Sequence, residues 1–340
     1  MEDAGALVNY ELGLRAGEWV EVRSAEEILS SLDDQGCLDS LPFMPEMLQF
    51  CGKAFRVFKV AHKTCDTIET YKGRRMTSAV HLDGLRCNGN AHGGCQAACL
   101  LFWKEAWLKR TIPEQSAPPG VNSSSAAGSQ AIAVDPSRGF EKLQGTTLAL
   151  SAGGAESEKR YSCQATEVVR ATSPLAWWVP GQYFQDLASG NVGLLHFVRY
   201  VVIAAFNVVM RLHWRGRPRM FPYVRGLAGE KTPTAILDLQ PGELVRVRSR
   251  DEIMPTINAR QRNRGLWFDV EMVPYCGKTF KVLQRVDRII NEKTGAMMKL
   301  PNPCIILDRV TCSGCLSQDR LFCPRSIYLY WREIWLERVE

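Results

Sequence analysis

The sequence predicts an α+β protein in which a small β-rich domain occurs twice. Residues 17–87 align with residues 242–312 without a gap, at a constant offset of 225, and about twenty of the 71 aligned positions are identical. Both aligned segments alternate between apolar and polar residues, as strands with one buried face do. We therefore expect a tandem duplication in which each copy forms a partly open barrel.

The alternating segments give the positions of the strands. WVEVRS and LVRVRS open the two copies, and KAFRVFKVAHKT and KTFKVLQRVDRII follow as longer strands. Turn residues in YKGRR and NEKTG then predict a hairpin that returns the chain through AVHLDGLRC and PCIILDRVTC. With the turn centred near Lys72, we expect Cys65 and Ala79 to be cross-strand neighbours, about 5 Å apart.

Each copy is predicted to end in an amphipathic helix that closes the barrel. After the last aligned cysteine the offset grows by three, and LLFWKEAWLKR then matches YLYWREIWLERV. Trp103 and Trp107, like Trp331 and Trp335, are four residues apart and would share one helix face. We interpret these tryptophans as anchors in the domain core.

Composition divides the chain into a first Cys-rich repeat, a disordered linker, a helical connecting segment and a second Cys-rich repeat, at residues 14–111, 112–160, 161–236 and 239–340. The linker prediction rests on PEQSAPPGVNSSSAAGSQ, which cannot bury enough apolar surface to fold.

The apolar run GLLHFVRYVVIAAFNVVMRLHW predicts a helix that is buried or packs against a partner. A helix on a membrane surface is the alternative, because basic residues follow it. The longest uncharged part of this run, Tyr200 to Met210, is too short for a bilayer, so no transmembrane segment is expected.

Charge and the N-terminus limit partners and location. The net charge of +6 is spread over 42 basic and 36 acidic residues and concentrates on neither repeat, so nucleic-acid binding is the least favoured function. The first twenty residues lack the basic start and apolar core of an export signal, which predicts a cytoplasmic protein. Thiols stay reduced there, so we interpret the twelve cysteines as metal ligands or buried thiols rather than disulfides.

The offset shows which cysteines recur. Cys51 matches Cys276, Cys87 matches Cys312, and Cys95, aligned through the tryptophans, matches Cys323. Candidate metal ligands in the first copy are Cys51, Cys65, Cys87 and Cys95, with His92 and Cys99 as alternates. Those in the second copy are Cys276, Cys304, Cys312 and Cys323, with Cys315 completing a CxxC pair.

Two ligand sets stay open for the first copy. In one, Cys65 takes across the hairpin the place that Cys304 holds in the second copy. In the other, His92 corresponds to Cys315, which gives three thiolates and one imidazole against an all-thiolate set. All-cysteine donors suit zinc and iron–sulfur clusters alike, whereas a histidine favours zinc.

Carboxylates and one further cysteine accompany these candidate ligands. The recurring carboxylates Glu46 and Glu271 are interpreted as helix caps or as supports for the ligands. Cys163 has no counterpart; we interpret it mainly as a packing residue that could reach a cluster.

LPFMPEMLQFCGK, RCNGNAHGGCQAACLLFWKEAW and CSGCLSQDRLFCPRSIYLYWREIWLERV resemble an uncharacterised cysteine-rich bacterial family found in natural-product and polysaccharide biosynthetic gene clusters. The strand GELVRVRS resembles those of KOW and other SH3-like barrels. The first resemblance implies an accessory or tailoring role, with a pathway protein or a small-molecule substrate as partner, but no particular reaction.

Three functions follow in order of preference. The first is a metal-binding protein with two thiolate clusters, holding zinc or iron–sulfur. The second is a metalloenzyme with one open metal position, suggested by the surplus donors Cys99 and His92. The third is a nucleic-acid-binding module. The chain carries no GxSxG, HExxH or GxxxxGK[ST] motif, which leaves a reaction unassigned.

Overall fold

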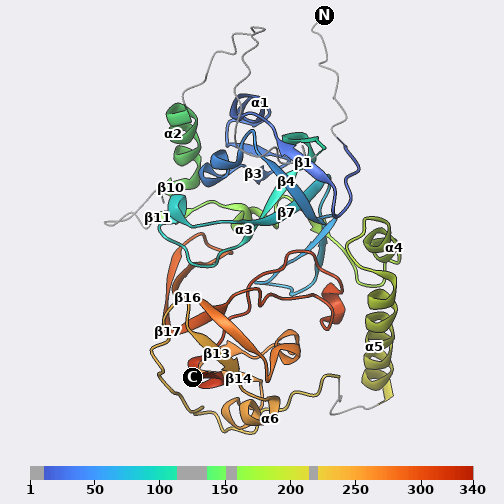
Figure 1. Ribbon diagram of the computed structural model, residues 1–340, viewed down its shortest axis with the longest axis vertical. Helices are drawn as coiled ribbons and strands as arrows, with labels where there is room; N and C mark the ends of the chain where they lie inside the picture. Colours follow the sequence, from blue (N-terminus) through green and yellow to red (C-terminus); the bar gives the residue numbers. More distant parts are fainter. Residues whose placement is uncertain (1–10, 113–135, 151–158, 214–220, 340) are drawn as a thin grey trace, which may run out of the picture.

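The computed structural model describes residues 11–112, 136–150, 159–213 and 221–339. Two curled half-barrel sheets and a few helices form a mixed α+β protein (Figure 1). We call residues 11–112 the first lobe and residues 221–339 the second lobe. The lobes lie one above the other in Figure 1, and each contains its own apolar core.

A five-stranded sheet in the order β8-β7-β4-β1-β9 forms the first lobe. Its strands are β1 (Trp19–Val22), β4 (Ala54–Val60), β7 (Ala79–Arg86), β8 (Leu100–Lys104) and β9 (Leu108–Arg110). Around it lie α1 (Ala25–Ser30), β2 (Cys37–Leu38), β3 (Leu41–Pro42), β5 (Lys63–Cys65), β6 (Gly73–Arg75) and the 3-10 helices η1 (Pro45–Phe50), η2 (Asn90–His92) and η3 (Glu105–Trp107).

A four-stranded sheet in the order β17-β16-β13-β18 forms the second lobe. Its strands are β13 (Leu244–Val247), β16 (Thr279–Ile290), β17 (Met297–Leu307) and β18 (Leu336–Arg338). The smaller elements are α6 (Arg250–Ile253), η4 (Met254–Thr256), β14 (Arg262–Asn263), β15 (Leu266–Trp267), η5 (Val270–Tyr275), η6 (Gln318–Arg320) and η7 (Glu333–Trp335).

The two sheets pair in matching registers. Val20 lies opposite Phe55 between β1 and β4, and Val245 lies opposite Phe280 between β13 and β16, 225 positions further on. The pairs β4–β7 and β16–β17 match in the same way, including a register irregularity at the same place. Helices α1 and α6 each begin with a capping box of serine and glutamate. The offset read from the sequence therefore also relates the backbones of the two sheets.

The prediction of a terminal helix in each repeat is wrong. Trp103 lies in β8 and Trp107 in η3, while Trp331 forms an isolated bridge to β17 and Trp335 lies in η7. All four indole rings are fully buried, so their predicted place in the cores is confirmed. A strand followed by a 3-10 turn also brings residues four apart into one core, which is why the spacing was misleading.

The predicted hairpin of the first lobe exists in a different register. Cys65 lies opposite Gly73 between β5 and β6, and Ala79 accepts a backbone hydrogen bond from Ala61. Cys65 and Ala79 are therefore not cross-strand neighbours. The reason lies in the turn, where the Asp66 carboxylate accepts the N–H groups of the second, third and fourth residues after it and closes a compact loop.

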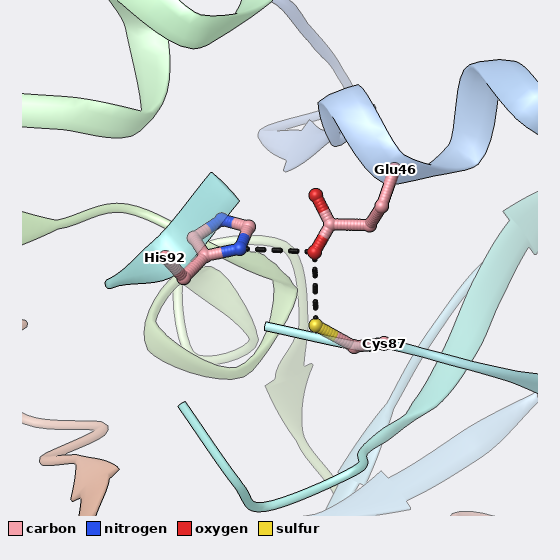
Figure 2. Close-up of side chains that lie close together, drawn as sticks. All are labelled: Glu46, Cys87 and His92. Atoms are coloured by element: carbon pink, nitrogen blue, oxygen red, sulfur yellow. Dashed lines mark hydrogen bonds and ion pairs between the residues drawn. The ribbon is translucent and has the colours of Figure 1, made fainter. Parts of the chain in front are cut away.

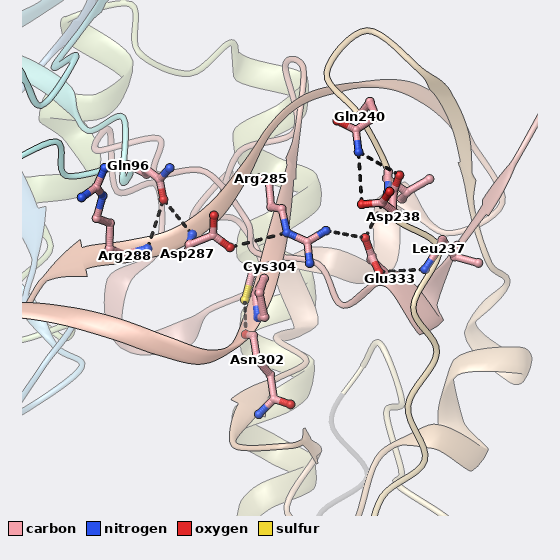
Figure 3. A network of polar contacts seen from close by, with 12 residues as sticks. Gln96, Leu237, Asp238, Gln240, Arg285, Asp287, Arg288, Asn302, Cys304 and Glu333 are labelled. Atoms are coloured by element: carbon pink, nitrogen blue, oxygen red, sulfur yellow. Dashed lines mark hydrogen bonds and ion pairs between the residues drawn. The ribbon is translucent and has the colours of Figure 1, made fainter.

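Each long hairpin reaches the opposite lobe. Lys63 of β5 donates to the carbonyl of Leu321 in the second lobe at 2.7 Å. In the other direction, the Gln96 side chain of the first lobe accepts the backbone N–H groups of Asp287 and Arg288 in β16 at 2.7 and 3.0 Å (Figure 3). The hairpin tips thus cross between the lobes.

Between the lobes the chain forms α2 (Pro136–Thr147), β10 (Leu148–Leu150), β11 (Lys159–Tyr161), α3 (Gln164–Glu167), β12 (Ser173–Pro174), α4 (Gly181–Ala188) and α5 (Leu194–His213). Residues 113–135 and 151–158 of the predicted linker lie outside the described residues. Helix α2 falls inside the predicted linker, and its Leu143 is buried in the core of the first lobe. The linker prediction therefore extended over a segment that folds.

Helix α5 is the predicted helix of the connecting segment, but it lies on the surface. Phe197 stacks on Phe322 of the second lobe, with ring centroids 5.4 Å apart, while Val202 and Phe206 are exposed. Among the described helices, α5 alone is long and apolar enough to cross a membrane, and 6% of that window is buried. The uncharged stretch from Tyr200 to Met210 lies inside this helix, and whether the helix contacts a membrane stays a prediction.

Candidate metal centre

Three side chains from separate segments of the first lobe converge in its interior (Figure 2). Glu46 lies in η1, Cys87 directly follows β7, and His92 ends η2. The side chains of Glu46 and His92 are only 3% and 1% exposed. An acid and an imidazole so deeply buried require strong compensating partners.

A glycine turn brings His92 back toward Cys87. Gly89 has a φ of +74°, and a Cβ there would lie 2.0 Å from the carbonyl oxygen of Cys95. Only glycine fits this position, because both the backbone conformation and the close approach exclude a side chain. The carbonyl of Gly89 accepts the N–H of His92 at 2.9 Å. The tight loop fixes the imidazole above the end of β7.

All three donors meet at one carboxylate oxygen. Cys87 Sγ donates to Glu46 Oε1 at 3.0 Å, and His92 Nδ1 lies 3.0 Å from the same oxygen. One ligand atom from each residue lies within 4.8 Å of the other two, the single such group among the described residues. Glu46 Oε2 and His92 Nε2 are buried without a hydrogen-bond partner. Buried polar atoms left in this way mark places where an ion, a ligand or water completes the set.

The electrostatics keep the carboxyl charged and the thiol protonated. Burial acts to raise the pKa of Glu46, but the hydrogen bond and charge of His92 outweigh it, so the pKa lies below its usual value. Burial and the nearby Glu46 charge raise the pKa of Cys87 well above that of a free thiol. A bound cation would reverse the second effect, because metal binding displaces thiol protons.

A small cavity of about 40 Å³ lies beside this triad. Cys87, Cys95, Cys99 and Cys163 all line it, together with His92. Burial raises the pKa of Cys99 and of Cys163 to about 12, so both are neutral thiols without a metal. The cavity has room for an ion with a water-sized ligand rather than for a large organic molecule.

The same place in the second lobe is built differently. Glu271, the counterpart of Glu46, accepts the Ser313 hydroxyl at 2.6 Å and the N–H groups of Leu316 and Ser317 at 2.7 and 2.9 Å. Arg320 takes the position of His92, since its carbonyl accepts the next cysteine's N–H as that of His92 does. Both Glu271 oxygens are therefore occupied by the loop, and this carboxylate anchors the backbone.

Two of the recurring cysteines lie apart from these clusters. Cys51 and Cys276 end η1 and η5 and pack against the two cores. Burial raises the pKa of each thiol to about 11. Within the described residues neither belongs to the converging group of Glu46, Cys87 and His92, which indicates a packing role for this pair.

The remaining predicted ligands separate into two groups. Cys304 packs in a small apolar cluster with Val286 and Ile306 and lies near the Asn302 carbonyl (Figure 3). By contrast, Cys65 of the first lobe contacts Cys323 of the second, close to the loop that carries Cys312 and Cys315. Neither of the ligand sets drawn up for the first copy matches the observed triad.

Sequence reasoning missed Glu46 as a site residue. Its recurrence as Glu271 suggested a structural role, and that role holds only in the second lobe. The signal lay in the difference between the loops, since the first copy has a histidine in its glycine-rich loop and the second has an arginine at the matching place.

Comparison of the chain with protein-family models, with curated proteins and with solved structures finds no match.

Proposed function

We propose that the protein binds one zinc-type divalent ion through Glu46, Cys87 and His92. The observation that carries this proposal is the convergence of thiol, imidazole and carboxylate donors within 4.8 Å of one another in the interior of the first lobe. Carboxylate, thiolate and imidazole are all common zinc ligands. One carboxylate oxygen of Glu46 is shared by Cys87 and His92, and the other has no hydrogen-bond partner. This arrangement suits a carboxylate that would coordinate a metal ion.

The donor types and the space available favour a single ion over an iron–sulfur cluster. Clusters are held mainly by cysteine thiolates, whereas this centre mixes three donor types. The adjoining cavity of about 40 Å³ is small. Zinc with three protein ligands keeps a fourth position open. That position would face the cavity, where Cys95 could close it or a small molecule could enter.

The open position supports a metalloenzyme as the second candidate. An ion with a free coordination site can polarise a substrate or activate water. The resemblance to proteins of biosynthetic gene clusters is compatible with such a tailoring role.

The tandem duplication of an SH3-like domain is likewise our proposal. It is supported by the shared offset and the matching strand registers.

Metal content tests the main proposal. The purified full chain, reconstituted with zinc under reducing conditions, is expected to hold an ion that Cys87→Ser, His92→Asn and Glu46→Gln each weaken by more than about 100-fold. Even residues that only orient metal ligands contribute about 10- to 100-fold to affinity. Elemental analysis and competition with a chromogenic chelator measure the change.

Cys51→Ser is the matched control, because this recurring thiol packs on the core of the first lobe and is not one of the three converging donors. It should leave zinc affinity unchanged. Cobalt substitution adds a spectroscopic check, since Cys87→Ser should lose the part of the cysteine-to-cobalt charge-transfer absorbance that comes from this centre. Equal zinc affinity in all four variants would overturn the proposal.

A further inference from the structure

A second group of thiols lies where the two lobes meet. Cys65, at the end of β5 in the first lobe, lies beside the Cys323 segment of the second lobe, where Arg325 donates to the Cys65 carbonyl at 3.0 Å, and the Cys65 and Cys323 thiols are close enough to interact electrostatically. Cys312 is near enough to interact electrostatically with both. Cys315 follows in the same loop and completes a CxxC pair with Cys312. All four thiols are buried.

The loop that carries the CxxC pair is folded tightly onto Cys323. Gly314, between the two cysteines, has a φ of +68°, and a Cβ there would lie 2.6 Å from the backbone nitrogen of Cys323. Glu271 holds the far side of the loop by accepting two of its backbone N–H groups. The loop is thus held in place by its own contacts, with both CxxC thiols near the lobe boundary.

Buried cations surround these thiols. Lys63, Arg320 and Arg325 are all buried or nearly so, and each pairs with a carboxylate, as Lys63–Asp186 at 2.6 Å, Arg320–Asp269 at 2.7 Å and Arg325–Glu292 at 3.1 Å. Arg325 also donates to the carbonyl of Cys65 at 3.0 Å. A divalent ion with four thiolates carries excess negative charge, which cations in such positions stabilise.

The matching place in the first lobe lacks the thiol that crosses between lobes. Ile290 aligns with Cys65, and Cys95 aligns with Cys323. Ile290 lies at Cys95, and its backbone N–H donates to Cys95 Sγ at 3.4 Å. Both hairpins therefore deliver a residue to the cysteine of the other lobe, but only the first-lobe hairpin delivers a thiol.

We propose that Cys65, Cys312, Cys315 and Cys323 form a second metal site, a tetrathiolate zinc site shared between the lobes. Four thiolates around one ion with no open position are typical of structural zinc sites. On binding, each thiol loses its proton to solvent and forms a bond to the ion, and the side chains of Cys312 and Cys315 turn toward the Cys65–Cys323 pair.

His196 of α5 lies against one of these thiols. Its Nε2 atom lies 3.4 Å from Cys315 Sγ, so the helix packs directly over the site. The site shares no residue with the Glu46–Cys87–His92 centre. Its existence therefore does not depend on the function proposed above.

X-ray absorption at the zinc edge of the Cys87→Ser variant tests this site directly. That substitution removes a ligand of the first centre and leaves the shared site intact. We expect the zinc that remains to have four sulfur neighbours and no nitrogen or oxygen neighbours. A zinc-free Cys87→Ser variant overturns the shared site without bearing on the first centre.

Zinc content of Cys65→Ser gives the complementary test. We expect this variant to lose one zinc per chain relative to the wild type, while Cys304→Ser, at a buried cysteine in a separate apolar cluster, loses none. Circular dichroism and the cobalt band of the first centre establish that Cys65→Ser is folded. A folded Cys65→Ser variant with unchanged zinc content contradicts the proposal.

Discussion

Glu46 and Glu271 show how the surroundings of a residue decide its use. They occupy equivalent positions in the two lobes, and both are buried. The carboxylate of Glu271 has two backbone N–H groups and a hydroxyl as partners. That of Glu46 has a thiol and an imidazole as partners, and its second oxygen has none. The same side chain is an anchor in one lobe and a candidate ligand in the other.

A second residue with a divergent counterpart is His81. It is fully buried in β7, its Nδ1 lies 2.9 Å from the carbonyl oxygen of Leu101, and burial lowers its pKa to about 3. The aligned residue in the second lobe is Ile306, which is also fully buried. His81 therefore makes the stability of the fold sensitive to acid.

The sign follows from proton binding. Between about pH 6.5, the ordinary pKa of histidine, and about pH 3, the unfolded chain binds a proton that folded His81 does not, so this residue lowers stability as pH falls through that window. We predict that lowering the pH from 7 to 5 reduces the free energy of unfolding of the wild type by about 2 kcal/mol more than that of His81→Ile. Urea denaturation at the two pH values measures the difference, and equal losses would contradict the assignment.

At the scale of elements, the strands were predictable and the connections were not. Alternation located β1, β4, β13 and β16, because each strand has one face in a core. The spacing of Trp103 and Trp107 indicated a helix, since it does not distinguish a helix from a strand followed by a 3-10 turn. Periodicity reports which residues are buried together more reliably than it reports the backbone between them.

The candidate site was only partly readable from the sequence for a related reason. Cys87 and His92 are five residues apart and both appeared among the candidate ligands, but Glu46 comes from a separate element. The contact between Cys65 and Cys323 joins residues 258 positions apart in two lobes. Local spacing carries no information on such a contact, because it arises from how the lobes pack.

The exposed and packed sides of helix α5 are expected to contribute differently to the stability of the fold. Val202 and Phe206 lie on its exposed side, at 61% and 44% exposure. We predict that the double substitution to glutamine changes the free energy of unfolding by no more than about 0.5 kcal/mol, as is usual for exposed positions. Phe322→Ala, which removes the ring stacked against this helix, should cost about 3 kcal/mol.

Denaturant unfolding of the two variants compares these costs. A large loss of stability in the α5 double variant would mean that its apolar side is covered within the folded chain. If the double variant is as stable as the wild type, the exposed apolar side of α5 is free to contact a partner or a membrane surface. Binding to lipid vesicles can then be compared between this variant and the wild type.

For the whole molecule, the crossing hairpins predict that the lobes hold together without a continuous chain. Contacts between the lobes include Lys63–Leu321, Arg86–Ser326, Thr67–Glu292, Gln96–Arg288 and Arg325–Cys65. We predict that cleavage at a protease site inserted between residues 112 and 136 yields two fragments that elute together on size-exclusion chromatography. Separation of the fragments under native conditions would show that these contacts are too weak to join the lobes.

The exchange of hairpin tips has a consequence for the symmetry of the molecule. Two copies that each extend a hairpin to the other's cysteine loop have the arrangement of an isologous homodimer, in which every contact occurs twice about a twofold axis. Within one polypeptide, however, the two halves of such a pair need not be identical. One cysteine loop meets the backbone of Ile290 where the other meets that of Cys65, so the two loops can differ in chemistry while they share one arrangement.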